Sequence, residues 1–390
     1  MRTVGIIAEY NPLHQGHAWH IAEAKKAAGA DYAVVVMSST FTQRGEAAIV
    51  SPRDRAEMAL AAGADAVFAL PVCWAVRDAE HFALGGVSIL HSLGVDAISF
   101  GVEIDHLKGL WRAANLLSDP PEEMKAALRE ALEMGVSYPT ALHMAMKKTD
   151  LAASYLLTKP NCTLAVEYLR AMKRLGSGME VYPIRREGSY HATTLGEEPM
   201  PSATALRAAI LRGDWAGAKA GMPDAAWDIL RHAAQQGRIH RPDALDQALL
   251  YRLRTIQDAS SLPDVSEGVE MRLLWSARQC PTREATLQDA KTRRYPYARL
   301  SRLCAHALLG VTQEMLDAQP LPPAAWLLGL KKGSEALMGQ LKQGGFPLIA
   351  KAADYPRGEE WFEIEKRAYD LWALGVGEAC GLALRQGVAR

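Results

Sequence analysis

The chain has 390 residues, of which 49% are hydrophobic and 23% are charged. This is the composition of a folded globular protein large enough for two hydrophobic cores, and it excludes a disordered chain. The 44 basic side chains equal the 44 acidic ones in number, so any surface for nucleic acid must be a local cluster.

The sequence contains no sign of a membrane or secreted protein. No apolar run reaches the roughly 18 residues of a membrane-spanning helix, and the first residues do not resemble a signal peptide. The five cysteines lie far apart and show no CxxC spacing, which predicts free thiols in a reducing compartment and neither a disulfide set nor a metal site. We therefore expect a cytoplasmic protein.

The first predicted element is a short buried strand over residues 4–8 that leads into a helix. The Asn11-Pro12 pair ends this strand, because the residue before a proline disfavours helix. Residues 14–17 read HQGH, and helical spacing begins at about His17. Two imidazoles and a glycine are therefore expected where a strand passes into a helix N-terminus.

This location suits phosphate chemistry. Free backbone N–H groups and the positive end of the helix dipole attract an anion, and Gly16 lets the backbone approach it closely. His14 and His17 can donate hydrogen bonds to phosphate oxygens and offset the charge that develops when an α-phosphate is attacked. Such a reaction needs no covalent protein nucleophile.

Further strands alternate with helices along the first half of the chain. Strands are predicted over 33–37, 66–70, 97–100 and 180–184, and helices over 53–62 and 78–93. Helical crossovers of this length predict a parallel α/β sheet that binds ligands at the carboxyl ends of its strands. Polar loops follow three of the strands, and two of these loops cover residues 38–46 and 101–103.

A second anion site is predicted after the last of these strands. Residues 201–207 read PSATALR, in which Ser202 is a suitable N-cap. The hydroxyls of Ser202 and Thr204, together with free N–H groups, could hold a phosphate. Ordinary helix capping is the alternative explanation.

From Trp215 onward the pattern is helical, over 227–234, 243–256, 269–277, 300–309, 323–330 and 359–374. We therefore predict a catalytic α/β domain over residues 1–212 and an all-helical domain over residues 213–390. The helical part contains a basic segment with two tyrosines. Cations that meet phosphates and tyrosines that stack on bases would suit RNA, although a solvated charge run is the usual explanation of such clusters. The residues predicted to bind RNA are Lys291, Arg293, Arg294, Tyr295, Arg299 and Arg302.

The His-x-Gly-His pattern resembles the signature of the nucleotidylyltransferase superfamily, and PSATALR resembles a second string of these enzymes. The longer string EYNPLHQGHAWH resembles the bacterial tRNA(Met) cytidine acetate ligases, and SSTFTQRGEAAIV, LPVCWAVRDAEHFALG, ISFGVE, KPNCTLAVEYL, RREGSYH, SEGVEMRL and KTRRYPYARLSRL extend the similarity over most of the chain. Val102, Cys162 and the pair Arg77-Asp78 depart from the family pattern.

The resemblance implies a Rossmann-like parallel-sheet domain and a two-step ligase. Acetate and ATP would give acetyladenylate and pyrophosphate, and the acetyl group would then pass to N4 of the wobble cytidine (C34) of elongator tRNA(Met). The family's ATP contacts would fall on Ile7, Ala8, Glu9, Tyr10, Asn11, Pro12, Leu13, His14, Gln15, Gly16, His17, Ala18, Trp19, His20, Gly101, Asn161 and Arg186.

Within this scheme His14 and His17 are the expected catalytic residues, and Arg186, Ser202 and Thr204 would contact the phosphates. We expect Mg²⁺ to arrive with the triphosphate, because the sequence contains no carboxylate cluster that would hold it alone. No obligate protein partner is expected. Two alternatives remain open, namely a nucleotidylyltransferase for a small molecule and a non-catalytic RNA-binding protein on the same scaffold. The sequence does not identify the acyl donor.

Overall fold

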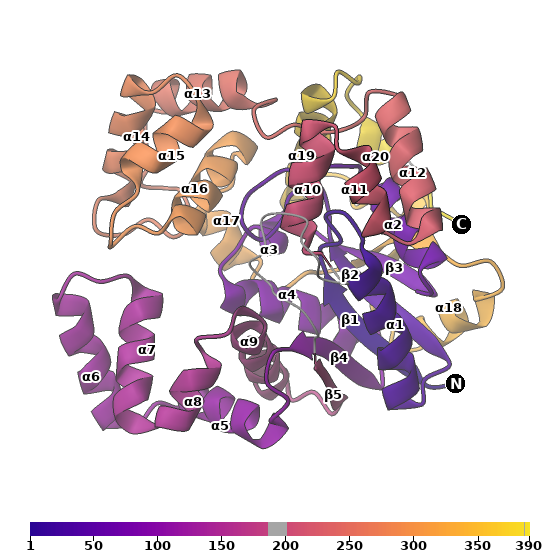
Figure 1. Cartoon of the computed structure of the whole chain (residues 1–390), viewed down its shortest axis with the longest axis horizontal. Helices are drawn as coiled ribbons and strands as arrows, with labels where there is room; N and C mark the ends of the chain where they lie inside the picture. The colour runs from indigo at the N-terminus through magenta and orange to yellow at the C-terminus, as the bar shows by residue number, and fades with distance from the viewer. Residues whose placement is uncertain (186–200, 386) are drawn as a thin grey trace.

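The computed structural model describes residues 1–185, 201–385 and 387–390. Its centre is a seven-stranded sheet in the order β5-β4-β1-β2-β3-β6-β7 (Figure 1). The strands are β1 (Thr3–Ala8), β2 (Tyr32–Ser38), β3 (Ala66–Leu70), β4 (Ala97–Val102), β5 (Glu180–Arg185), β6 (Ala325–Leu330) and β7 (Leu348–Ile349).

The first five strands run parallel, as the sequence predicts. Their central members are almost wholly apolar and buried, which is the pattern of strands covered on both faces. β1 lies between β2 and β4. The loops that follow these three strands therefore meet at one edge, where a ligand of a parallel sheet binds. The predicted α/β fold class is confirmed.

Helices cover both faces of the sheet. On one face lie α1 (Gln15–Ala28) and α2 (Pro52–Ala61), and on the other lie α4 (Ala79–Ser92) and α9 (Pro160–Leu175). α4 packs closely on β1, because a Cβ added to Gly86 would lie 2.7 Å from Ile7 Cδ1. This close packing fixes the strand from which the HQGH segment continues.

Further helices surround the sheet. The helices α5–α8 and α13–α16 form two outlying groups at the left of Figure 1, whereas α10–α12 lie beside α1 and α2. Their bounds are α3 (Val72–Ala75), α5 (Leu107–Ser118), α6 (Glu122–Glu133), α7 (Tyr138–Thr149), α8 (Leu151–Leu156), α10 (Ala203–Arg212), α11 (Trp215–Ala220), α12 (Asp224–Gln235), α13 (Asp246–Thr255), α14 (Val269–Gln279), α15 (Arg283–Ala290), α16 (Tyr297–Leu309), α17 (Gln313–Ala318), α18 (Glu335–Leu341), α19 (Glu360–Gly375) and α20 (Leu382–Arg385).

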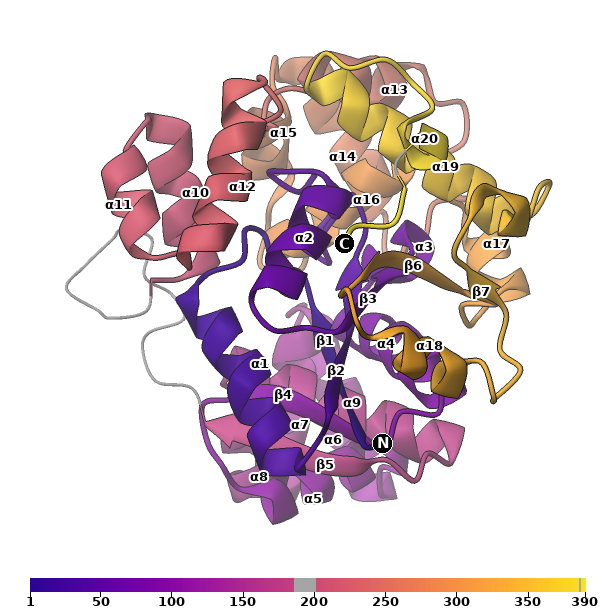
Figure 2. The same ribbon diagram turned by 90° about the vertical axis from the view of Figure 1, so that its right-hand side faces the viewer.

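The expectation of an all-helical second half is wrong at two strands, β6 and the short β7 that pairs with it. Residues 325–330 form the strand β6, which pairs antiparallel with β3, and Figure 2 shows the two strands side by side. The segment reads AWLLGL and is buried throughout, and a short apolar run of this kind cannot be distinguished from a buried helix by its periodicity. The chain thus returns to the sheet after residue 212.

The hydrophobic cores divide residues 213–390 differently from the domain boundary predicted from the sequence. Among the described residues after 212, α13–α16 have a core of their own, which includes Leu253, Leu273 and Leu300. Trp326 and Trp372 belong to the core of the sheet. The predicted division at residue 212 stays a prediction, but the unit with its own core is the smaller bundle of α13–α16. In the part of the chain that the structure describes, no helix is long and apolar enough to cross a membrane.

Candidate active site

The segment between β1 and α1 forms a tight crossover at the carboxyl edge of the sheet. Tyr10 has a positive φ of 47°, and the Asn11-Pro12 peptide bond is cis. The side chain of Asn11 accepts a hydrogen bond from the backbone N–H of Ile49 at 2.8 Å, and its carbonyl accepts one from Arg207 at 2.7 Å. The motif backbone is therefore held from two sides.

His14 and His17 lie together at the start of α1. His14 is the N-cap residue, and its ring stacks on that of His17 with 3.6 Å between centroids and 23° between planes. The backbone N–H of His14 donates to Nδ1 of His17 at 3.3 Å. A neutral His17 consequently carries its proton on Nε2, which makes that atom a hydrogen-bond donor. The predicted pair of imidazoles at a helix N-terminus is thus assembled.

The predicted contacts on either side of the two histidines have different environments. Tyr10, Asn11 and Leu13 are at most 4% exposed, so they can meet a nucleotide only through backbone atoms. Pro12 is buried as well and Gln15 is exposed, whereas the predicted contacts from Gly16 to His20 lie half-buried along the first turns of α1. His20 Nε2 lies 3.2 Å from Ser99 Oγ in β4, which directs this side of the helix toward the neighbouring strand.

Gly101 and Asn161 lie where β4 ends and α9 begins. Between them stands Glu103, whose carboxylate accepts hydrogen bonds from the backbone N–H groups of Asn161 and Cys162, both at 3.0 Å. The Asn161 amide donates to the same carboxylate at 2.9 Å. Burial alone would raise the pKa of Glu103, but these hydrogen bonds outweigh it and hold the pKa below its usual value. Glu103 thus caps α9 and orients Asn161, a role that the sequence did not reveal.

Ser202 and Thr204 lie at the N-terminus of α10. Ser202 is the N-cap and accepts from the backbone N–H of Ala205 at 3.1 Å, as capping requires. Thr204 Oγ1 accepts from Arg207 at 3.3 Å, and the same guanidinium holds the carbonyl of Asn11. Arg207 therefore joins the second predicted anion site to the HQGH segment. It closes the string PSATALR, which is the only signal that could have singled it out.

A fully buried arginine supports the same edge from below. Arg55 of α2 is 0% exposed and donates to the carbonyls of Glu9 at 2.7 Å and Ser38 at 2.9 Å, and also to that of Ser39. It thereby ties the end of β1 to the end of β2. Sequence reasoning missed it, because an arginine in an amphipathic helix usually faces solvent.

Glu9 is the acidic residue nearest to the motif. Its Oε1 accepts from the backbone N–H of Gln43 at 2.7 Å. Burial raises its pKa, although Gln43 and the charges of Arg207, Arg44 and Arg55 act in the opposite direction. The edge therefore carries little uncompensated negative charge, which favours an anionic substrate.

The predicted RNA-binding residues lie around the start of α16. Lys291 and Arg293 are exposed, whereas Arg299 donates to the Asp264 carbonyl at 2.8 Å. Arg294 and Arg302 make long ion pairs of 3.9 Å with Glu267 and Asp264. Tyr295 is a core residue, 9% exposed, and its hydroxyl donates to the Glu267 carbonyl. Its ring is therefore not placed to stack on a base, contrary to the expectation.

The structure gives no account of Arg186 or of the Mg²⁺ expected with ATP. Arg186 lies outside the described residues. In the described ranges no three His, Cys, Asp or Glu side chains gather as a metal site would need.

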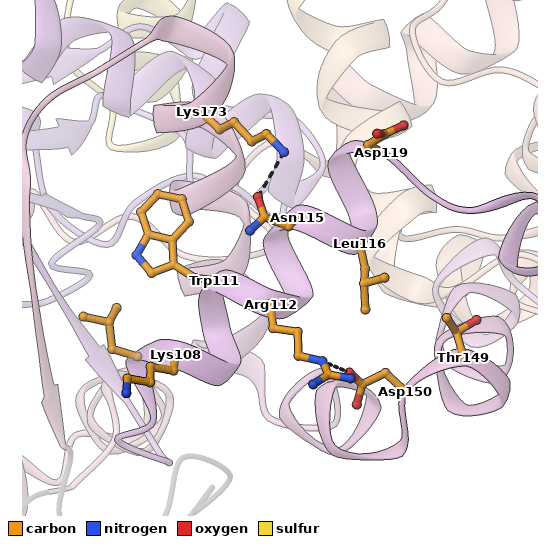
Figure 3. Close-up of a pocket in the computed structure, with 10 residues that line it drawn as sticks. Lys108, Trp111, Arg112, Asn115, Leu116, Asp119, Thr149, Asp150 and Lys173 are labelled. Carbon is orange, nitrogen blue, oxygen red and sulfur yellow. Dashed lines mark hydrogen bonds and ion pairs between the residues drawn. The ribbon is translucent and has the colours of Figure 1, made fainter.

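A cavity of about 960 Å³ lies on α5, outside the predicted site. Figure 3 shows Lys173 paired with Asn115 and Arg112 paired with Asp150 around Trp111. No residue predicted to bind ATP or RNA lines it, so we assign it no part in the reaction.

Comparison with known proteins agrees with a nucleotide site at the start of α1. Residues 1–382 match the family model described as HIGH Nucleotidyl Transferase. The chain is 35% identical over 381 residues to the tRNA(Met) cytidine acetate ligase of Geobacillus sp. (strain WCH70), covering 96% of this chain and 94% of the relative. It is 33% identical over 390 residues to the protein of the same name from Bacillus subtilis (strain 168), covering 97% and 93%.

Solved structures give the same match in three dimensions. Thermotoga maritima TmcAL in its apo form superposes with a TM-score of 0.92 at 27% identity, over 100% of both chains. The TmcAL structure bound with alpha-thio ATP superposes with a TM-score of 0.89 at 27% identity, over 99% of this chain and 97% of that one.

Proposed function

This chain belongs to the HIGH nucleotidyl transferase family and, within it, to the tRNA(Met) cytidine acetate ligases, and from this membership we propose that it acetylates N4 of the wobble cytidine of elongator tRNA(Met). It is an ATP-dependent ligase, and the proposed acyl donor is acetate. Because the tRNA substrate is cytoplasmic, we place the enzyme in the same compartment.

The first step forms acetyladenylate. A carboxylate oxygen of acetate attacks the α-phosphorus of ATP, a new P–O bond forms, and the bond to the bridging oxygen breaks so that pyrophosphate leaves. The observation that best supports this step is the stacked pair of His14 and His17 at the N-terminus of α1. Nε2 of His17 would donate to a non-bridging oxygen, and the α1 dipole would stabilise the same charge.

The remaining nucleotide contacts are proposed from their positions around this pair. Gly101 and Asn161 would bind the adenosine on the β4 side. Ser202 and Thr204 would contact phosphate oxygens from the α10 side, to which Arg207 connects them, and Arg186 is proposed for the same role from its sequence alone. Mg²⁺ would enter with ATP and neutralise charge on the departing pyrophosphate.

In the second step the N4 amine of the cytidine attacks the acetyl carbonyl carbon. The amide C–N bond forms, the C–O bond to AMP breaks, AMP leaves with the electron pair, and the amine loses one proton. A base in the single-stranded anticodon loop can leave its stack at low cost. Lys291, Arg293, Arg294, Arg299 and Arg302 are the residues proposed to hold the tRNA backbone, whereas Tyr295 would contribute through the bundle core.

The test measures pyrophosphate release from ATP with a panel of short carboxylates, followed by nucleoside analysis of added tRNA(Met). Acetate-dependent release and new N4-acetylcytidine are the expected results. His17→Asn should lower release about 100-fold or more, while its amide can still accept the His14 N–H and preserve the cap. His91→Asn, at an exposed position of α4, should leave release unchanged. Release that requires another substrate and leaves tRNA unmodified would overturn the proposal.

A further inference from the structure

Arg77 is a buried cation without a counter-ion in the described structure. It lies in the turn between α3 and α4 and is 5% exposed. Among the residues that the structure describes, no carboxylate forms an ion pair with its guanidinium, and its Nε has no hydrogen-bond partner. Its carbonyl accepts from the Gln43 side chain at 2.8 Å, which holds the backbone and gives the guanidinium no partner. A buried unpaired charge is strongly destabilising unless an anion joins it.

A second arginine lies against the same loop as Arg77, because Gln43 binds the Arg77 carbonyl and a Cβ added to Gly45 would lie 2.9 Å from the Arg302 Cα. Arg302 lies on α16, and its Nε also has no hydrogen-bond partner, because Asp264 Oδ2 is 3.9 Å away. Burial and the nearby charges of Arg299 and Arg77 lower the pKa of Arg302, although Asp264 and Asp78 oppose this shift. These two guanidinium groups and that of Arg299 therefore share one largely buried region with the carboxylates of Asp264 and Asp78. Three positive charges face two negative ones.

The neighbouring groups balance these positive charges only in part, and Asp78, whose pKa is lowered chiefly by His81 and also by Arg77, is shared with that histidine. Asp78 Oδ1 accepts from the backbone N–H of His81 at 2.9 Å and lies 2.8 Å from its imidazole. His306, wholly buried on α16, has its pKa lowered to about 3 by burial and by the two arginines, so it is neutral. The region thus has the donors and the charge for one tetrahedral anion, and Arg presents these donors in a fixed planar fork that suits phosphate.

The position of this pair favours RNA over ATP as the source of the anion. The proposed adenosine contacts lie on the β4 side of β1, whereas Arg77 follows β3, on the other side of β1. Adjacent strands are about 4.8 Å apart, so the end of β3 lies roughly 10 Å from the HQGH strand. Arg302 belongs to the basic segment proposed to hold tRNA. A backbone phosphate of a nucleotide that reaches the acyl group would fall in this region.

We propose that Arg77 and Arg302 bind one phosphate group of the tRNA backbone at the junction of the catalytic edge and α16. This inference rests on the proposed function and names a residue of this site that departs from the family's sequence pattern. One phosphate contact adds to affinity without reading sequence.

The test compares Arg77→Met, Arg77→Lys and Arg302→Met with wild type. Direct tRNA binding, measured without ATP, should weaken about tenfold at low salt in both Met variants, and the slope of log affinity against log salt should fall by about 1. Arg77→Lys should retain most of the slope. Arg174→Met, at an exposed position of α9, is the matched control and should change neither quantity.

Two further measurements identify the anion. Acetate-dependent exchange of pyrophosphate into ATP should stay within twofold of wild type in Arg77→Met, because that step uses no tRNA. The melting temperature of Arg77→Met without ligand should equal or exceed that of wild type, because the substitution removes an unpaired buried charge. An unchanged salt slope would overturn the proposal, and so would a parallel loss of exchange, which would assign the pair to ATP. Absence of exchange in the wild type would instead refute the proposed function, while the binding result would still stand.

Discussion

Arg55 and Arg77 are two buried arginines at the same edge of the sheet, in opposite circumstances. Arg55 donates to three backbone carbonyls that belong to the ends of β1 and β2. Arg77 is almost equally buried, yet within the described residues its guanidinium has no ion pair. The difference shows that burial of a charge does not define its role. A cation surrounded by acceptors stabilises the fold, whereas one without them is suited to an external anion.

The largest expected effect is on stability, and it concerns Arg55, the arginine whose guanidinium has hydrogen-bond partners. Arg55→Met should lower the free energy of unfolding by about 3 kcal/mol or more, because it leaves buried carbonyls without donors. Urea unfolding measures the loss. Arg53→Met, two residues away on the same helix and partly exposed, should cost much less. Equal losses in the two variants would remove the structural role of Arg55, and a loss in Arg77→Met as large as in Arg55→Met would remove the contrast.

A buried acid extends the comparison to negative charge. Glu365 of α19 is 0% exposed and accepts from the Val72 N–H at 2.6 Å, and burial raises its pKa to about 7. Because its folded pKa lies above the unfolded one, stability should fall as pH rises from about 4.5 to about 7. Glu365→Gln should therefore be about 2 kcal/mol more stable than wild type at pH 8. Below about pH 4, where the carboxyl is protonated in both states, the two should be nearly equal.

Unfolding at a series of pH values measures the Glu365 effect as the difference between the two proteins, so that groups common to both cancel. A difference that stays constant from pH 5 to pH 8 would contradict the prediction, because it would show that Glu365 does not titrate in this range.

The smallest expected effect concerns Glu103, a carboxylate that is hydrogen-bonded to the start of α9. Glu103→Gln should cost about 1 kcal/mol at pH 7, since the carboxylate caps α9. The pKa of Glu103 is lowered in the folded state, so its contribution is present above pH 4.5 and is lost as pH falls further. Thermal unfolding at pH 7 and pH 4 measures both values. Glu122→Gln, at the exposed start of α6, should cost less. A loss in Glu103→Gln that does not change with pH would show that the charge of Glu103 does not stabilise α9.

The local parts of this site were predictable from the sequence, and the long-range parts were not. The HQGH segment specifies its own geometry, because a strand end, a proline and a helix start are encoded within residues 4–17, and the structure has them all. The strands β1 to β4 follow from apolar runs in the same way. By contrast, the roles of Arg55, Glu103 and Arg207 depend on partners that are remote in sequence.

The composition of the basic segment predicted its structure less well than the HQGH motif predicted the local site. The basic segment before and within α16 suggested one continuous RNA surface, but Tyr295 is buried in the bundle. Its neighbours Arg299 and Arg302 partly interact with the Asp264 region. The helix expected over 323–330 failed for a related reason, because only the pairing with β3 makes that apolar run a strand.

The return of the chain to the sheet has a consequence for biosynthesis. Ala69 pairs with Trp326, and Trp372 Nε1 donates to the carbonyl of Ala48 at 2.7 Å across 324 positions of sequence. Contacts of such high sequence separation form late and slowly. A ribosome must therefore release nearly the whole chain before the loop after β2 receives its support. A nascent chain stalled before β6 would carry the full histidine motif on an unfinished, aggregation-prone sheet edge.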